Sequence, residues 1–290
     1  MRFVPLTAFT IDRWKIINLF WDSVRAGVYP YGMSTPVGNS LGASPVYFLI
    51  AYPAYATGWF ELLPLSVPWI WWFGFPRLNL QLRLTGLIFI FASPIFIYEI
   101  LTRSTLLFNS ILIAAFCAWI LSVKTWNWKI VILYGILGGL LLNTRTVFGL
   151  PIAVAMLYLI RRRELSMRII CTACMMAMTY IAVYVIFALF WSTAEVLTAN
   201  PLTVQSENLY PPLFMLIMIF IATVGGLVAC RKNVLLFGGV CMFIAVAAYI
   251  AIQISRHGCQ AALLGKESDI TYLAFCLPFI LPYLTLSKKY

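Results

Sequence analysis

Charged residues are scarce in this chain: of its 290 residues, 10% are Asp, Glu, Lys or Arg, while 63% are hydrophobic. Soluble globular domains carry about 25% charged residues, and so few charges cannot cover a surface that faces water. The composition therefore excludes an ordinary soluble enzyme, a disordered chain and a secreted disulfide scaffold. The mean hydropathy of +0.94 indicates an integral membrane protein. At about 20 apolar residues per span, we predict an all-α, polytopic transmembrane bundle of about 8–10 spans.

Histidine and the common nucleotide and hydrolase motifs are also lacking. The one histidine, His257, excludes a metal site or a catalytic dyad built from histidines. The chain has no Gly-rich phosphate loop, no Walker lysine and no G-x-S-x-G, which leaves nucleotide-driven transport and serine-hydrolase chemistry without support. Cys171 and Cys174 form a C-x-x-C inside the apolar run Ile169–Trp191, but no second pair or histidine cluster completes a metal set. We interpret the seven cysteines as structural.

Acidic residues are the rarer charge, with 9 Asp and Glu against 20 Lys and Arg and a net charge of +11. A basic excess is typical of nucleic-acid binding, but Lys and Arg also collect in the cytoplasmic loops of membrane proteins. We predict no nucleic-acid partner. Twelve of the 20 basic residues fall in alternate inter-span segments, which are Arg77–Arg83, Lys124–Lys129, Arg161–Arg168, Arg231–Lys232 and Lys288–Lys289.

These basic segments are predicted to face the cytoplasm of a multi-pass membrane protein. The segments predicted to face outward are then the N-terminal segment, Glu99–Arg103, Asn143–Arg145 and Ser192–Pro211. This orientation requires Ala43–Pro76 to cross the bilayer an odd number of times and Ile130–Ile160 to form a hairpin of two short helices. If Ala43–Pro76 crosses twice, the early loops invert. The other predicted spans are Leu84–Leu101, Thr105–Val123, Ile169–Trp191, Pro212–Cys230, Val234–Ile254 and Ile270–Leu286.

The first 42 residues contain no apolar window of spanning length. We predict an outer interfacial segment over 1–42 and a transmembrane domain over 43–290. An amphipathic helix is expected over Ile11–Val24, at the membrane interface. Its apolar stripe is predicted to be Ile11, Trp14, Ile17, Trp21 and Val24, with Ile16, Leu19 and Phe20 off the stripe. Because an outward-facing start is awkward to insert, we also expect a transmembrane helix before Met1.

Two carboxylates of this segment are candidates for chemistry. Asp12 and Asp22 are ten residues apart, about 80° from one another around a helix. Either carboxylate is suited to act as a general base or a metal ligand. The alternative interpretation is a solvated acid paired with Lys15 or Arg25.

Further candidates lie at the predicted outer face. Glu99 and Arg103 stand at i, i+4 near the end of a span, where ionisable residues are functional candidates or helix-end ion pairs. Arg145 interrupts an apolar tract at the predicted hairpin tip, where a guanidinium can hold a phosphate or simply snorkel to the interface. Gly135, Gly138 and Gly139 precede it and indicate close helix packing.

Several stretches in the first 160 residues together resemble the C-type membrane glycosyltransferases, the GT-C superfamily. Thr10-Ile-Asp12-Arg-Trp, Trp21-Asp22-Ser and Gly27-Val-Tyr29-Pro30-Tyr31-Gly32 resemble the first outer loop of that superfamily, in which an Asp precedes a Gly-x-x-Pro-Tyr turn. The tract from Gly38 to Phe48 resembles the entry to the next span. Tyr98–Ser104 and Leu140–Phe148 resemble later segments.

The resemblance implies an all-helical enzyme that passes a sugar from a polyprenyl-phosphate donor to a glycan or lipid acceptor outside the cytoplasm. It implies that Asp12, with Asp22 in reserve, acts as base or metal ligand, so that a divalent metal ion is the one cofactor implied. It assigns Arg103 or Arg145 to the donor phosphate. Tyr29 and Tyr31 can stack on a sugar, although anchoring at the interface explains them equally well. Two alternatives remain: a transporter or flippase, and a non-catalytic protein of envelope-polysaccharide assembly.

Overall fold

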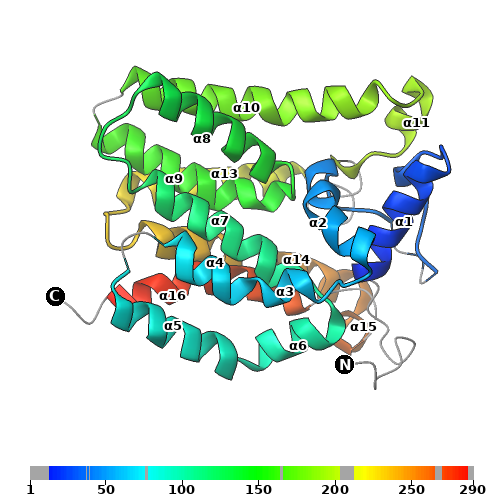
Figure 1. Ribbon diagram of the computed structural model, residues 1–290, viewed down its shortest axis with the longest axis horizontal. Helices are drawn as coiled ribbons and strands as arrows, with labels where there is room; N and C mark the ends of the chain where they lie inside the picture. Colours follow the sequence, from blue (N-terminus) through cyan, green and yellow to red (C-terminus); the bar gives the residue numbers. More distant parts are fainter. Residues whose placement is uncertain are drawn as a thin grey trace.

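The computed structural model describes residues 13–36, 38, 40–75, 78–163, 166–202, 212–264 and 270–286. Within these ranges the chain is built from helices, and the one strand-like feature is an isolated bridge between Ser34 and Ser40. The predicted all-α class is therefore confirmed. Figure 1 shows the long helices lying roughly side by side, with α1 (Arg13–Arg25), α2 (Pro45–Thr57) and α11 (Thr193–Thr198) gathered at one end.

The remaining helices follow the apolar tracts of the sequence. Several begin at a side chain that accepts a backbone N–H: Asn79 caps α5, Asn127 caps α8 and Ser192 caps α11. The elements not yet introduced are η2 (Pro30–Gly32), α3 (Leu62–Leu65), α4 (Val67–Gly74), α5 (Leu80–Ala92), α6 (Pro94–Thr102), α7 (Leu106–Ile120), α8 (Trp128–Leu142), η3 (Thr146–Phe148), α9 (Gly149–Arg162), α10 (Met167–Ala188), α13 (Pro212–Val228), α14 (Val234–His257), α15 (Cys259–Leu264), η4 (Ile270–Cys276) and α16 (Leu277–Leu286).

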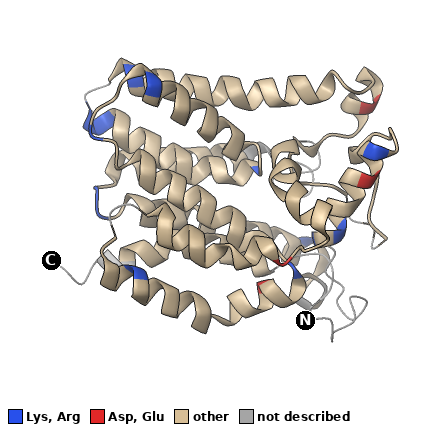
Figure 2. Ribbon diagram, viewed as in Figure 1, with Lys and Arg blue, Asp and Glu red and all other residues tan. Residues whose placement is uncertain are grey.

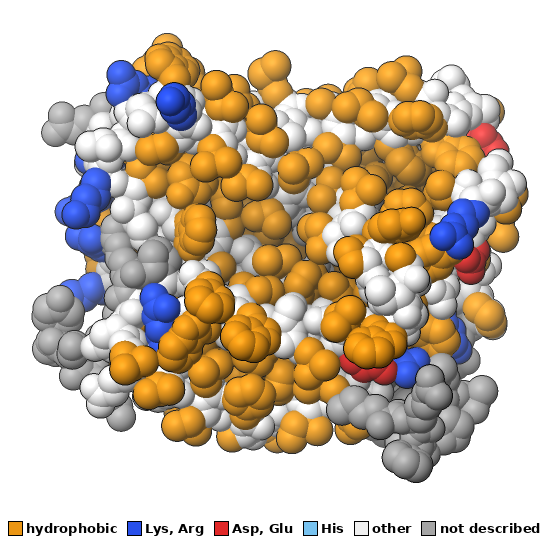
Figure 3. Space-filling model, viewed as in Figure 1, with side chains coloured by type: hydrophobic (Ala, Val, Ile, Leu, Met, Phe, Trp, Pro, Cys, Tyr) orange, Lys and Arg blue, Asp and Glu red, His pale blue; other side chains and the backbone are white. Residues whose placement is uncertain are grey.

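Charge separates to the two ends of this bundle. In Figure 2 the acidic residues of the described part all lie at the end that carries α1 and α11, and most Lys and Arg lie at the opposite end. The surface between the ends is mainly hydrophobic on the face that Figure 3 shows. Many large apolar side chains of the described residues are exposed, such as Ile88 at 68% and Phe220 at 67%. An exposed apolar belt between two charged ends is what a lipid bilayer requires.

Two described helices are long and apolar enough to cross a membrane, α10 with 22 residues and α14 with 24. A third span results if α5 and α6 count as one, although they are bent by 60° at Ser93. The sequence predicted one unbroken span over Leu84–Leu101. Pro94 explains the break, because proline disfavours the helical conformation at the residue before it. The shorter apolar helices are Leu62–Gly74, Leu106–Ile120, Trp128–Leu142, Phe214–Val228 and Thr271–Tyr283.

The predicted hairpin over Ile130–Ile160 is present, since α8 ends at Leu142 and α9 begins at Gly149. The glycines before its tip do pack closely, as predicted. A Cβ added at Gly139 would lie 2.5 Å from Thr179 Cβ and 2.6 Å from the backbone oxygen of Met176, and Gly135 and Gly138 meet α10 in the same way. The small residues therefore let α8 and α10 approach at backbone distance.

The helix predicted over Ile11–Val24 is present as α1 (Arg13–Arg25), but its buried face differs from the predicted stripe. The buried residues are Arg13, Ile17, Phe20 and Ser23, which recur at i, i+4, i+7 and i+10. Phe20, placed off the stripe by the sequence, stacks on Phe48 of α2 with ring centroids 3.9 Å apart. The helix is thus rotated from the expected face, because α2 covers the side that bears Phe20.

Candidate functional site

Glu99 is the central carboxylate of a buried cluster at the acidic end of the bundle. It lies near the end of α6, and its side chain is 0% exposed. Its Oε2 accepts a hydrogen bond from the backbone N–H of Leu107 (3.1 Å), and its Oε1 accepts one from Ser104 Oγ (2.6 Å). The start of α7 therefore holds the carboxylate, where the helix dipole favours a negative charge.

Arg13, at the start of α1, supplies the opposite charge. Its Nη1 lies 3.5 Å from Glu99 Oε1 and also donates to Ser104 Oγ, while its Nη2 donates to Thr271 Oγ1 of η4. Its Cζ lies 5.7 Å from the ring centroid of Tyr272. This one guanidinium thus ties together three segments that are far apart in the sequence: α1, the α6–α7 turn and η4.

The predicted pairing of Glu99 with Arg103 does not form. Arg103 adopts a left-handed backbone conformation (φ 54°) where α6 ends, so its side chain leaves the face of the helix that bears Glu99. Arg103 Nε instead donates to Glu61 Oε1 (2.6 Å), and its Cζ lies 5.9 Å from the ring centroid of Trp14. Arg103 therefore belongs to a second, partly exposed ion pair beside the buried cluster.

Arg145 lies at the tip of the α8–α9 hairpin, as predicted. The turn that carries it is fixed from two sides: Ser44 N–H donates to Thr144 O (3.2 Å), and Asn143 Nδ2 donates to Tyr180 O (3.3 Å). The guanidinium is surrounded by aromatic rings, with Cζ 5.9 Å from the centroid of Tyr47, 5.7 Å from Tyr272 and 5.9 Å from Phe275.

The charge of Arg145 is not balanced in the part of the chain that the structure describes. Its Nε is buried and has no hydrogen-bond partner, and no described carboxylate forms an ion pair with it. Glu99 is occupied by Arg13, Ser104 and Leu107. A partly buried cation without a counter-charge is unfavourable, because it has lost part of its hydration. Low-dielectric surroundings also strengthen its attraction to an anion. The cluster is therefore suited to bind an anionic group.

Tyr29 and Tyr31 are packed into the protein at this end. Tyr29 OH donates to Ala199 O (2.5 Å) and Tyr31 OH donates to Ala43 O (2.9 Å). Both side chains are under 5% exposed, and their rings contact Phe187. Burial, with a smaller contribution from Glu195, raises the pKa of Tyr29 to about 12, so that its hydroxyl stays protonated and donating at neutral pH. In this arrangement the two rings hold η2 against α10.

Of the two candidate carboxylates of the first segment, the structure describes Asp22. Asp22 is exposed on α1 and accepts a hydrogen bond from Tyr55 OH (2.6 Å). Nine residues separate it from Arg13, which is roughly 13 Å along a helix axis, so Asp22 is remote from the buried cluster. Asp12 lies outside the described residues. In the part of the chain that is described, no three His, Cys, Asp or Glu side chains gather as a metal site would require.

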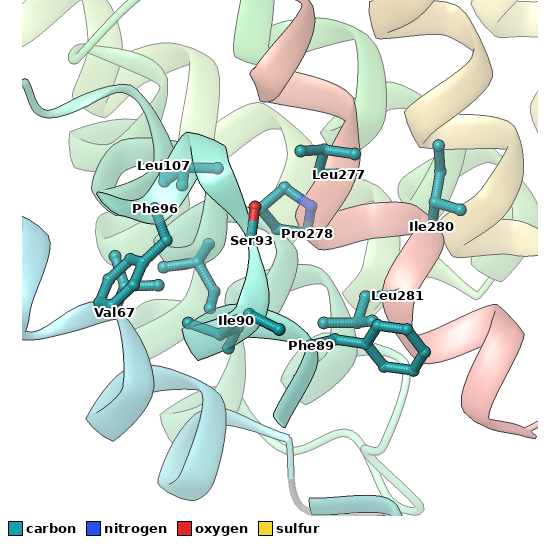
Figure 4. A pocket seen from close by; sticks show the side chains of 12 residues that line it. Val67, Phe89, Ile90, Ser93, Phe96, Leu107, Leu277, Pro278, Ile280 and Leu281 are labelled. Carbon is teal, nitrogen blue, oxygen red and sulfur yellow. The ribbon is translucent and has the colours of Figure 1, made fainter. Parts of the chain in front are cut away.

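An apolar cavity of about 360 Å³ lies beside the cluster. Figure 4 shows side chains around it from both arms of the α5–α6 bend, from α7 and from α16. Leu107, whose N–H binds Glu99, lines the cavity, and so do Leu277 and Pro278, which directly follow η4. The start of α7 and the junction of η4 with α16 thus border both the cavity and the charged cluster.

Sequence reasoning found Glu99, Arg103 and Arg145 but missed Arg13, Tyr272 and the residues that bind them. The sequence contained one indication for Arg13: it lies at helical spacing from Ile17 and Phe20, on the face of α1 that is buried. The contacts of Tyr272 carry no local sequence signal, because η4 meets α1 and the α8–α9 hairpin only in the folded chain.

Comparison with known proteins adds no name to this site. No family model matches the chain, and no curated protein matches it. The resemblance to C-type glycosyltransferases therefore rests on the residues quoted from the sequence alone.

Proposed function

We propose that this chain is a multi-pass inner-membrane protein of the C-type glycosyltransferase kind. It takes a sugar from a polyprenyl-phosphate donor and passes it to a glycan or lipid acceptor outside the cytoplasm. The observation that carries the proposal is Arg145, a guanidinium without a counter-charge among the described residues, in the turn between α8 and α9.

The apolar cavity is evidence for a ligand with a hydrocarbon part as well as a charged part. Its twelve lining residues include one polar side chain, Ser93. A lipid phosphate combines the two features, because its hydrocarbon chain suits the apolar cavity and its negative group suits the Arg145 guanidinium. Transfer of an isoprenoid chain from water to such a cavity is favourable by about 0.8 kcal/mol per buried CH₂.

The proposed reaction assigns a step to each charged group. The Asp12 carboxylate takes the proton of the acceptor hydroxyl, and the acceptor oxygen forms a bond to the anomeric carbon of the donor sugar. The bond between that carbon and the phosphate oxygen breaks, and the polyprenyl phosphate leaves with an added negative charge. Arg145 stabilises that charge. Glu99 and Arg13 hold the walls of the site in place.

A flippase is the second candidate function, and the α5–α6 break favours it. Broken spans line the substrate sites of many transporters, and this one borders the apolar cavity. Purified protein in vesicles separates the functions when it is given a labelled polyprenyl-phosphate sugar and an acceptor. Transfer of label supports the enzyme; label that changes leaflet without transfer supports the flippase. If neither occurs, the third alternative, a non-catalytic assembly protein, is favoured.

Two native cysteines test the proposed orientation. Cys230 and Cys259 are exposed free thiols on either side of α14, one of the two clear spans. In variants that retain only one of them, we expect a membrane-impermeant maleimide to label Cys259 in intact cells and Cys230 only after permeabilisation. Labelling of both from the same side would show that α14 does not cross the membrane. Labelling with the sides exchanged would invert the orientation.

A further inference from the structure

Like Arg145, Asn109 of α7 has buried polar atoms without a hydrogen-bond partner among the described residues. Its side chain is 2% exposed, and neither its Nδ2 nor its Oδ1 has a hydrogen-bond partner among the residues that the structure describes. Nearly all buried amides in folded proteins are hydrogen-bonded, and an amide left without partners is destabilising. In the sequence, Asn109 is a polar residue inside the apolar run Thr105–Val123.

The contacts of its neighbours show where Asn109 points. Thr105 Oγ1 lies 2.8 Å from Tyr47 OH, and Ser110 Oγ donates to the backbone oxygen of Phe275. Around a helix, Asn109 lies about 40° from Thr105 and about 100° from Ser110, inside the sector between them. Arg145 Cζ lies 5.9 Å from the ring centroid of each of the same two residues, Tyr47 and Phe275. The Asn109 amide is therefore directed to the side of α7 on which Arg145 lies.

We infer that Asn109 and Arg145 form one ligand site, in which Arg145 binds the phosphate and Asn109 binds a hydroxyl of the sugar attached to it. This inference rests on the proposed function and adds the residue that recognises the sugar. A neutral amide suits a hydroxyl, because Oδ1 accepts the hydroxyl proton and Nδ2 donates to the hydroxyl oxygen. Beside a cation that already binds the phosphate, such a group distinguishes a glycosylated lipid phosphate from the bare one.

Asn109 is expected to lower the stability of the ligand-free protein and to strengthen its binding of the sugar-bearing lipid. Without ligand, the buried amide is unsatisfied, so the apolar isostere in Asn109→Leu should raise the midpoint temperature of unfolding of the ligand-free protein. The same variant should bind the sugar-bearing lipid less well. A residue with a purely structural role would show the opposite stability change, because its replacement would remove native hydrogen bonds.

The test measures the affinity of purified protein in nanodiscs for two probes, polyprenyl monophosphate and polyprenyl-phosphate hexose. We expect Asn109→Leu to weaken binding of the hexose-bearing lipid by about tenfold or more and to leave binding of the bare lipid phosphate within about twofold. Arg145→Gln should weaken both. Ser110→Ala is the matched control, since its hydroxyl already donates to Phe275 O. If Asn109→Leu does not fold, Asn109→Ser replaces it.

The outcomes separate the two proposals. If Asn109→Leu binds each probe with the same affinity as wild type, the sugar-binding role is overturned and the proposed phosphate site is unaffected. Unchanged binding of both probes by Arg145→Gln would overturn the proposed function itself. A fall in unfolding temperature for Asn109→Leu with unchanged affinities would assign the amide to folding alone.

Discussion

Replacing Arg13 by leucine is expected to lower the free energy of unfolding by about 3–5 kcal/mol. Glu99 is fully buried, and Arg13 is the one cation of the described chain with which it forms an ion pair. Removal of Arg13 leaves the buried Glu99 carboxyl group without its counter-ion, and it also removes the hydrogen bonds to Ser104 and Thr271. Denaturant or thermal unfolding in detergent measures the loss.

Arg25→Leu is the control for this prediction. Arg25 lies on the same helix, is exposed, and stacks on Tyr55 at 5.0 Å. Its replacement should change the free energy of unfolding by less than about 1 kcal/mol. The double variant Arg13→Leu, Glu99→Leu should recover much of the lost stability, because no buried charge remains. A double variant as unstable as the sum of both single changes would contradict the pairing.

Replacing Asp12 by asparagine is expected to reduce sugar transfer by about a hundredfold to ten-thousandfold, the range in which general-base catalysis contributes. The amide retains the shape of the side chain but cannot take a proton from the acceptor. The affinity for polyprenyl monophosphate and the unfolding temperature should stay close to those of wild type. Rates of label transfer in vesicles, followed against acceptor concentration, provide the measurement.

Asp22→Asn is the comparison for Asp12. Asp22 is exposed and bonded by Tyr55, far along α1 from the buried cluster, so its replacement should leave transfer largely intact. If Asp22→Asn abolishes transfer and Asp12→Asn does not, the roles of the two carboxylates are exchanged. If neither change affects transfer, the base is another residue.

Much of the fold was predictable because it depends on local composition. The helical class, the α8–α9 hairpin and the close packing of Gly139 on α10 follow from apolar runs, one polar interruption and small residues. The separation of basic and acidic ends was predictable from the order of charges along the chain, and Figure 2 shows the same separation. The bend at Ser93 was missed, although Pro94 was its local signal.

The partners within the site were not predictable, because they join distant parts of the chain. The i, i+4 spacing suggested that Glu99 pairs with Arg103, but the left-handed conformation of Arg103 turns it toward Glu61. Arg13 was not among the predicted site residues, whereas the structure binds it to Ser104 of the α6–α7 turn and to Thr271 of η4. Arg145 was recognised at its turn, but nothing near it in the sequence indicates the rings that surround it.

The most direct test of the account is binding of polyprenyl monophosphate to the purified protein, compared with binding of the uncharged polyprenol and repeated with Arg145→Gln. Because Arg145 has no counter-charge among the described residues, the account predicts that wild type binds the phosphate at least about thirtyfold more tightly than the polyprenol. It predicts that Arg145→Gln loses that preference, while Arg103→Gln, whose partner is Glu61, loses less of it. Equal binding of the two lipids by wild type, or an unchanged preference in Arg145→Gln, would contradict it.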